Sequence, residues 1–123
     1  MKFEISVIDY FSAAHNLRQY QGKCENIHGH NFKVKITLGA NSLDKTGMVY
    51  DFHYVKEVLK KTLKVLDHSH LNKLPYFGRV NPTSENIAKF IFNKLKAKIN
   101  KRTRKLIKVT VWETESNEAS YQE

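Results

Sequence analysis

Polarity alternates along residues 28–38, and this pattern constrains the fold more than any other stretch of the chain. Successive side chains of a β-strand point to opposite faces of its sheet, so the alternation predicts a strand with one buried face. The face predicted to be exposed carries Asn31, Lys33, Lys35 and Thr37. The buried face carries two histidines followed by apolar side chains: His28, His30, Phe32, Val34, Ile36 and Leu38.

The other periodic segments predict a mixed fold. Alternation over residues 3–15 predicts a first strand, with a bulge where Ile8 and Asp9 break the pattern. Helical spacing of apolar residues predicts a helix over about 52–66, and a hydroxyl cap within Pro82–Glu85 predicts the start of a second. Two last strands are predicted, one that buries Ile107, Val109 and Val111 and one over residues 118–122.

The order of these elements is ββααββ, with no repeat and no linker. We therefore expect one α+β domain over residues 1–123, with a mostly antiparallel sheet. The chain has no run near the ~18 apolar residues of a membrane span, and its N-terminus does not resemble a signal peptide. Its single cysteine cannot form an internal disulfide, so we expect a cytoplasmic protein.

The net charge of +9 is compatible with a nucleic-acid or polyphosphate ligand. The densest basic run, KINKRTRK at residues 98–105, lies between two periodic segments and is typical of a solvated turn. Charge alone therefore does not predict nucleic-acid binding. A non-catalytic, metal-stabilised nucleic-acid-binding module remains an alternative hypothesis.

A metal site is predicted from the histidines. His28 and His30 project to the same face of their strand, and His15 ends the first strand on its apolar parity. If the two strands pair, three imidazoles meet, which is the donor set of a catalytic zinc with an open fourth position. Cys24 as a fourth ligand would instead give a closed structural site, and spacing alone does not choose between the two.

Two further groups of ionisable residues are candidates for chemistry. Asp67 precedes His68, and a carboxylate beside an imidazole fixes its tautomer and raises its basicity. The alternative is that His68 merely complements the dipole of a helix C-terminus. Glu113 shares the parity of the buried valines in the third strand, where an ionised carboxylate needs a cation or several N–H donors.

Together these motifs resemble one known family. They are F-S-A-A-H ending at His15, C-x3-H-G-H at 24–30, G-M-V-x-D-F at 47–52, L-D-H at 66–68, P-T-S-E-N at 82–86 and W-E-T at 112–114. In this order they resemble the 6-pyruvoyltetrahydropterin synthase / 6-carboxytetrahydropterin synthase family over nearly the whole chain. The resemblance implies a tunnelling fold (T-fold), with two helices on one face of the sheet. It also implies trimers whose sheets form a barrel, stacked as a homohexamer with active sites between subunits.

The same resemblance implies residue roles. His15, His28 and His30 would bind Zn²⁺, Cys24 would be the catalytic base, and His68 with Asp67 would form a relay to it. Glu113 would anchor the amino-pyrimidine edge of the pterin, and Thr83 and Ser84 would line its pocket. His70 has no assigned role.

The spacing between Cys24 and the H-G-H motif resembles the bacterial 6-carboxytetrahydropterin synthases. The implied substrate is 7,8-dihydroneopterin triphosphate, converted on the route to queuosine and other 7-deazapurines. Glu25 departs from that pattern, because E-x-x-H-G-H resembles members that cleave dihydroneopterin for folate synthesis. Glu25 is therefore either a second catalytic residue or a solvated loop acid.

Overall fold

The computed structural model describes residues 1–19 and 25–123. The predicted ββααββ order is confirmed, with a two-residue strand and two 3-10 turns added between the helices. The elements are β1 (Phe3–His15), β2 (His28–Ala40), α1 (Phe52–Leu63), β3 (Ser69–His70), η1 (Leu71–Lys73), η2 (Pro75–Gly78), α2 (Ser84–Ile99), β4 (Arg104–Thr114) and β5 (Asn117–Gln122).

The sheet has the strand order β3-β1-β2-β4-β5 and is antiparallel except where β3 runs parallel to β1. β1 and β2 pair without interruption from Phe3 opposite Ala40 to His15 opposite His28. The predicted bulge at Ile8 and Asp9 is therefore wrong. Asp9 lies at a half-buried position, where its carboxylate remains partly solvated and accepts a hydrogen bond from the Tyr10 amide at 2.8 Å.

A bulge does occur between β2 and β4. Thr37 lies opposite Lys108 but Leu38 lies opposite Leu106, so Ile107 is the extra residue. Leu106 is consequently 3% exposed, whereas Ile107 is only half-buried, so the prediction that Ile107 lies on the buried face is wrong. Beyond this bulge Val109 and Val111 are buried as predicted, and a second shift in register, between β4 and β5, lies at Glu113.

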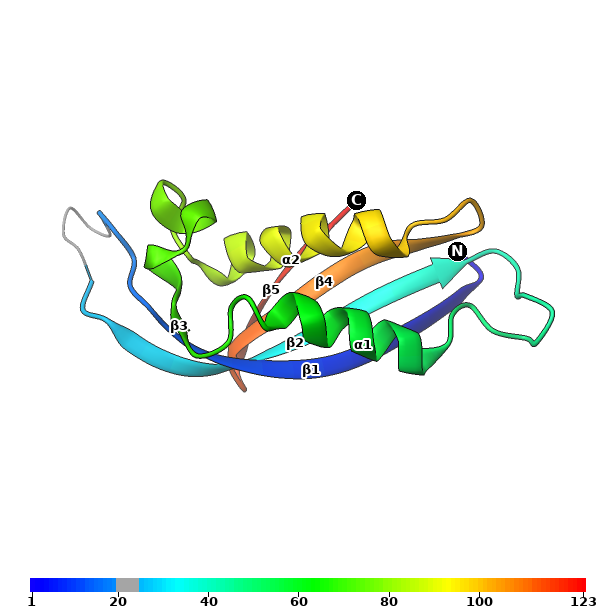
Figure 1. Ribbon diagram of the computed structural model, residues 1–123, viewed down its shortest axis with the longest axis horizontal. Coiled ribbons are helices and arrows are strands. Elements are labelled where there is room, and N and C mark those ends of the chain that lie inside the picture. Colours follow the sequence, from blue (N-terminus) through cyan, green and yellow to red (C-terminus); the bar gives the residue numbers. More distant parts are fainter. Residues whose placement is uncertain (20–24) are drawn as a thin grey trace.

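Both helices cover the same face of the curved sheet, as Figure 1 shows. α1 packs against β1, and α2 packs against β4 and β5. The core between these layers contains apolar side chains of β1, β2, α1, α2 and β4, among them Phe11, Phe32, Leu59, Ile91 and Val109. No helix in the described part of the chain is long and apolar enough to cross a membrane.

Side chains define where the helices begin. The carboxylate of Asp51 accepts the His53 amide at the start of α1, and the hydroxyl of Thr83 accepts the Asn86 amide at the start of α2. α1 ends at Leu63 rather than near residue 66, and a turn follows in which the amides of Leu66 and Asp67 both donate to the Leu63 carbonyl.

Candidate metal centre

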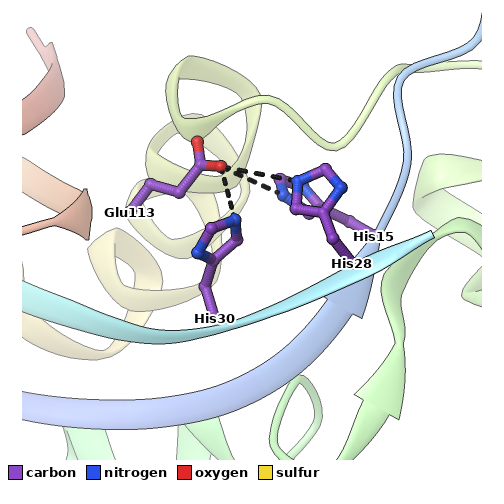
Figure 2. A group of neighbouring side chains, drawn as sticks. All are labelled: His15, His28, His30 and Glu113. Carbon is purple, nitrogen blue, oxygen red and sulfur yellow. Dashed lines mark ion pairs between the residues drawn. The ribbon is translucent and has the colours of Figure 1, made fainter. Parts of the chain in front are cut away.

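The predicted meeting of three histidines is confirmed at one end of the β1–β2 pair. His15 lies directly opposite His28, and His30 lies opposite Ala13, so all three imidazoles are on the helix-covered face of the sheet. Figure 2 shows the rings converging on one point. Strand register alone therefore brings together residues that are 13 and 15 positions apart in sequence.

Backbone carbonyls orient two of these rings. Nδ1 of His15 donates to the carbonyl of Pro82 at 2.7 Å, and Nδ1 of His28 donates to the carbonyl of Asn26 at 3.0 Å. A carbonyl only accepts hydrogen bonds, so each contact places the proton on Nδ1 and leaves Nε2 with a free lone pair. This is the usual outer-shell arrangement of metal-binding histidines.

The donor set fits a metal ion. Within residues 1–19 and 25–123, the buried Nε2 atoms of His15 and His30 make no hydrogen bond of acceptable geometry. Buried ring nitrogens without a partner are uncommon in native structures, and a bound cation would satisfy both. The ligand atoms of His15, His28, His30 and Glu113 all lie within 4.8 Å of one another. Imidazole nitrogens and a carboxylate oxygen are a donor set that suits Zn²⁺.

Glu113 lies closer to the histidines than its predicted role required. Its Oε1 atom is 2.7 Å from Nε2 of His30, 3.4 Å from Nε2 of His15 and 3.6 Å from Nε2 of His28. The carboxylate is 32% exposed, so it also faces the open side of the centre. The signal in the sequence was the parity from Val109 to Glu113, but the contact with His30 also depends on the β2–β4 register.

Burial shapes the electrostatics of the centre. Desolvation lowers the pKa of His30 below its ordinary value, and neighbouring His28 and His15 lower it further, while Glu113 acts in the opposite direction. The net effect favours the neutral imidazole, which is the form that binds metals.

The predicted pairing of Asp67 with His68 is present. Oδ2 of Asp67 is 2.9 Å from Nδ1 of His68, while its Oδ1 accepts the Ser12 amide at 2.8 Å. The Ser12 carbonyl in turn accepts the His68 amide at 2.6 Å, so both residues are fixed to β1. The hydrogen bond from Ser12 is the main cause that lowers the pKa of Asp67, followed by the contact with His68.

The backbone conformation of His68 is unusual and its side chain is exposed. Its φ of 56° lies in the left-handed region, which is uncommon for a residue with a side chain. The side chain is 83% exposed and lines a shallow hollow that also includes His30. His68 therefore does not follow the helix-end arrangement that was the alternative, because α1 has already ended at Leu63.

Of the two candidate residues that precede the H-G-H motif, the structure describes only Glu25. Cys24 lies outside the described residues. Glu25 is 28% exposed, its Oε1 accepts the Leu17 amide at 3.1 Å, and the same atom is 3.5 Å from Nδ1 of His28. It is therefore not a freely solvated loop acid.

The Pro82–Ser84 segment connects the centre to α2. The carbonyl of Pro82 accepts a hydrogen bond from His15, the Thr83 hydroxyl caps the helix by accepting a hydrogen bond from the Asn86 amide at 3.1 Å, and Ser84 is the first residue of the helix. The Thr83 hydroxyl thus has a structural partner, and the predicted pocket-lining role of Thr83 and Ser84 stays a prediction.

Comparison with known proteins identifies the fold family. The family model described as 6-pyruvoyl tetrahydropterin synthase matches residues 4–123. The chain belongs to the 6-pyruvoyl tetrahydropterin synthase family. The solved structure of the Caenorhabditis elegans 6-pyruvoyl tetrahydropterin synthase superimposes with a TM-score of 0.86 at 34% identity, covering 98% of this chain and 95% of that chain. The expected T-fold is confirmed by this likeness.

The curated relatives within this family carry two names. The 6-carboxy-5,6,7,8-tetrahydropterin synthase of Aquifex aeolicus is 32% identical over 161 residues, covering 100% of this chain and 99% of its own length. A putative 6-pyruvoyl tetrahydrobiopterin synthase of C. elegans is 36% identical over 127 residues, covering 93% and 90%. The chain is thus a member of an enzyme family of pterin synthesis, in which the product differs between members.

Proposed function

We propose that this chain is a zinc-dependent lyase. It would convert 7,8-dihydroneopterin triphosphate to 6-carboxy-5,6,7,8-tetrahydropterin, acetaldehyde and triphosphate, on the cytoplasmic route to queuosine and other 7-deazapurines. The observation that carries the proposal is the convergence of three histidine Nε2 atoms, two of them buried without a hydrogen bond among the described residues. The relatives named 6-carboxy-5,6,7,8-tetrahydropterin synthase favour this product over the alternatives.

His15, His28 and His30 would hold the zinc. When bound, zinc supplies Lewis acidity that lowers the pKa of substrate hydroxyl groups. The carbonyls of Pro82 and Asn26 keep two of the three imidazoles in the tautomer that presents Nε2. The chain's own contribution is therefore a rigid, correctly protonated donor set at the end of the sheet.

Cys24 would act as the base, with His68 promoting its thiolate form. A free thiol has a pKa of about 8.5 and needs such help at neutral pH. Asp67 supports this role because its carboxylate, held by the Ser12 amide, contacts Nδ1 of His68 and leaves Nε2 to exchange protons. The 83% exposure of His68 makes its ring accessible to substrate or to a neighbouring subunit.

We further propose that Glu113 anchors the pterin, with Thr83 and Ser84 lining its pocket. A carboxylate pairs well with the two adjacent N–H groups of an amino-pyrimidine edge, and Glu113 is 32% exposed on the open side of the centre. Its 2.7 Å contact with His30 also allows a different role, that of a fourth metal ligand.

The substitution Glu113→Gln separates these two roles. If Glu113 is the anchor, the loss of a charge-assisted hydrogen-bond pair should raise the KM for the pterin by about 10–100-fold, since such bonds contribute about 1.5–3 kcal/mol. Zinc affinity, measured by competition with a chromophoric chelator, should be unchanged. Weakened zinc binding with an unchanged KM would identify Glu113 as a ligand instead.

The site is proposed to be completed by assembly into a homohexamer of two stacked trimers. Among the described residues, β3 covers β1 only at Ala13 and Ala14, and β5 forms the other edge of the sheet. Both edges therefore offer unpaired backbone groups through which sheets of neighbouring subunits can continue as a barrel. Exposed His68 would then face an active site shared between subunits.

A product assay tests the proposed function directly. The purified, zinc-loaded protein is incubated separately with 7,8-dihydroneopterin triphosphate and with dihydroneopterin, and the products are identified by mass spectrometry. Carboxytetrahydropterin from the first substrate is the expected result. The absence of product from both substrates would contradict a catalytic function and would indicate that the metal centre is structural.

A second activity is favoured by the position of Glu25. Its carboxylate lies 3.5 Å from Nδ1 of His28, so it is at the centre rather than in solvent. We propose that it supports cleavage of dihydroneopterin to 6-hydroxymethyl-7,8-dihydropterin for folate synthesis. Among proteins that share the fold, solved structures of the Plasmodium vivax synthase include variants of a glutamate named there as a catalytic residue.

Glu25→Ala should therefore reduce the dihydroneopterin reaction by about 10²–10⁴-fold, the usual range for loss of a general acid–base group. The reaction of the triphosphate substrate should fall much less, because Cys24 is its proposed base. Both rates are measured on the same preparation of the variant, so that the losses of the two reactions can be compared directly. Equal losses on both substrates would show that Glu25 acts through its contact with the Leu17 backbone.

A nucleic-acid-binding function is not proposed for the basic segment at residues 98–105. Within it, Arg104 stacks over the ring of Tyr50 at 3.8 Å, and its Nη1 donates to the Val49 carbonyl at 3.2 Å. This cation therefore contributes to packing rather than to an open phosphate-binding surface.

A further inference from the structure

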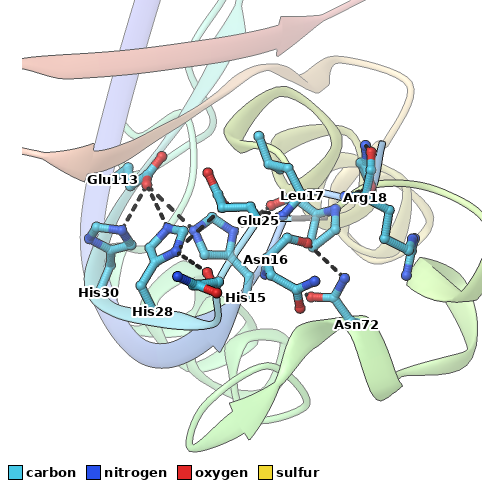
Figure 3. Close-up of polar contacts among 12 residues, drawn as sticks. His15, Asn16, Leu17, Arg18, Glu25, His28, His30, Asn72 and Glu113 are labelled. Carbon is cyan, nitrogen blue, oxygen red and sulfur yellow. Dashed lines mark hydrogen bonds and ion pairs between the residues drawn. The ribbon is translucent and has the colours of Figure 1, made fainter. Parts of the chain in front are cut away.

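The backbone that follows His15 has an unusual set of partners. The pairing of β1 with β2 ends at His15, and residues 16–18 continue beyond the sheet. Their backbone groups are bound mainly by side chains that are distant in sequence. Figure 3 shows Asn72 and Glu25 at this segment, beside the histidines.

Asn72 binds both backbone groups of Asn16. The Asn16 amide donates to Oδ1 of Asn72 at 3.0 Å, and Nδ2 of Asn72 donates to the Asn16 carbonyl at 2.8 Å. Nε2 of His70 lies 3.1 Å from Oδ1 of Asn16, so the side chain of Asn16 is held as well.

Asn81 repeats this arrangement two residues later. The Arg18 amide donates to Oδ1 of Asn81 at 2.9 Å, and Nδ2 of Asn81 donates to the Arg18 carbonyl at 3.0 Å. Nη2 of Arg18 donates to the carbonyls of Phe77 and Val80 at 2.6 and 3.0 Å. Residue 18 is therefore attached to the 77–81 segment by its backbone and its side chain.

Leu17, between these two residues, pairs with Glu25. The Glu25 amide donates to the Leu17 carbonyl at 2.9 Å, and the Leu17 amide donates to Oε1 of Glu25 at 3.1 Å. The backbone of residues 16–18 is thus held on one side by two asparagines and on the other by Glu25.

A primary amide suits this task because it carries an adjacent donor and acceptor, matching the N–H and C=O of one residue. The reciprocal pairing also fixes the amide orientation, since a flipped amide would set donor against donor and acceptor against acceptor. Asn81 immediately precedes Pro82, whose carbonyl accepts the hydrogen bond from Nδ1 of His15. The same segment therefore holds the imidazole and the backbone three residues beyond it.

We propose that Asn72 and Asn81 are positioning residues that fix the path of residues 16–18 and thereby set His15 and Glu25 at the metal centre. The inference rests on the proposed function in that it assigns the centre to zinc. It adds two residues to the machinery and gives His70 a role through Asn16.

Asn72→Asp and Asn81→Asp test the proposal with almost no change of shape. Each keeps the oxygen that accepts the backbone amide but replaces the Nδ2 donor by an oxygen facing a carbonyl. We expect faster amide hydrogen exchange at residues 16–18 and a zinc dissociation constant raised by about 10–100-fold, the usual effect of outer-shell substitutions. Asn93→Asp, on the exposed face of α2, is the matched control and should leave both unchanged.

The possible outcomes distinguish a positioning role of the asparagines from a purely structural role. They also keep this question separate from whether the proposed reaction occurs. A lowered melting temperature with unchanged zinc affinity and unchanged local exchange would overturn the proposal, because it would indicate a structural role only. If an aspartate variant does not fold, Asn72→Ala, on the 3-10 turn η1, provides the same readouts. If the wild-type protein turns over neither pterin, the proposed function fails, whereas the zinc and exchange measurements still decide the role of the asparagines.

Discussion

Replacement of His30 by alanine is expected to weaken zinc binding by roughly 100-fold or more. Four-ligand zinc sites contribute about 10–16 kcal/mol, so one ligand accounts for about 3 kcal/mol, and each 1.4 kcal/mol is a factor of ten. The buried Nε2 of His30 makes no hydrogen bond of acceptable geometry among the described residues and lies 2.7 Å from the Glu113 carboxylate, so this nitrogen is placed where a cation would be bound. Turnover should be abolished at zinc concentrations that saturate the wild-type protein.

The measurement is competition with a chromophoric chelator, combined with the zinc content of the purified protein. His53→Ala is the matched control, because His53 is exposed in the first turn of α1 and is not among the residues of the centre. It should bind zinc as the wild-type protein does. Wild-type zinc affinity in His30→Ala would show that His30 is not a ligand, whatever its effect on turnover.

The histidine cluster could be predicted from the sequence because it depends on the two-residue period of side chains along a β-strand. Side chains two residues apart on a strand share a face, and this rule alone aligned His28 with His30 and with the apolar core of β2. The extension to His15 required only that the first two predicted strands pair. Local propensity likewise predicted a hydroxyl cap within Pro82–Glu85, and in the structure this cap of α2 is Thr83.

Features that depend on register between distant strands were not predictable from periodicity. The bulge at Ile107 exchanges it with Leu106 in the core, because the extra residue in β4 is accommodated by a shift against β2 that leaves no mark in the local pattern. The contact of Glu113 with His30 lies just beyond the last β2–β4 pair, Lys33 opposite Trp112, and likewise leaves no mark in the local pattern. The parity of Glu113 predicted its face correctly but not its neighbours.

The contacts of Asn72 and Asn81 could not be predicted from the sequence either. Asn72 and Asn81 bind backbone groups of residues 16 and 18, and a hydrogen bond from a side chain to a distant backbone has no sequence period. In the sequence both look like ordinary loop asparagines, which favour turns. Their role follows only from the structure, in which the backbone of residues 16–18 leaves the sheet while its amides donate hydrogen bonds to side chains.

Cys24→Ala is expected to reduce turnover of 7,8-dihydroneopterin triphosphate by about 10²–10⁴-fold, the usual contribution of a general acid–base residue. Cys24 lies outside the described residues, so this prediction rests on the family resemblance and on the adjacent Glu25, which contacts both Leu17 and His28. Because the three histidines would supply the ligands of the proposed open zinc site without Cys24, zinc affinity should remain that of the wild-type protein.

Cys24→Ser is the informative companion, since a hydroxyl preserves the shape but is a far weaker acid than a thiol of pKa about 8.5. Both variants should retain zinc, lose the triphosphate reaction and keep any Glu25-dependent cleavage of dihydroneopterin. That combination would separate two bases acting at one metal centre. Loss of zinc together with both activities would instead make Cys24 the fourth ligand of a closed site, in which case the position needed for substrate would not exist.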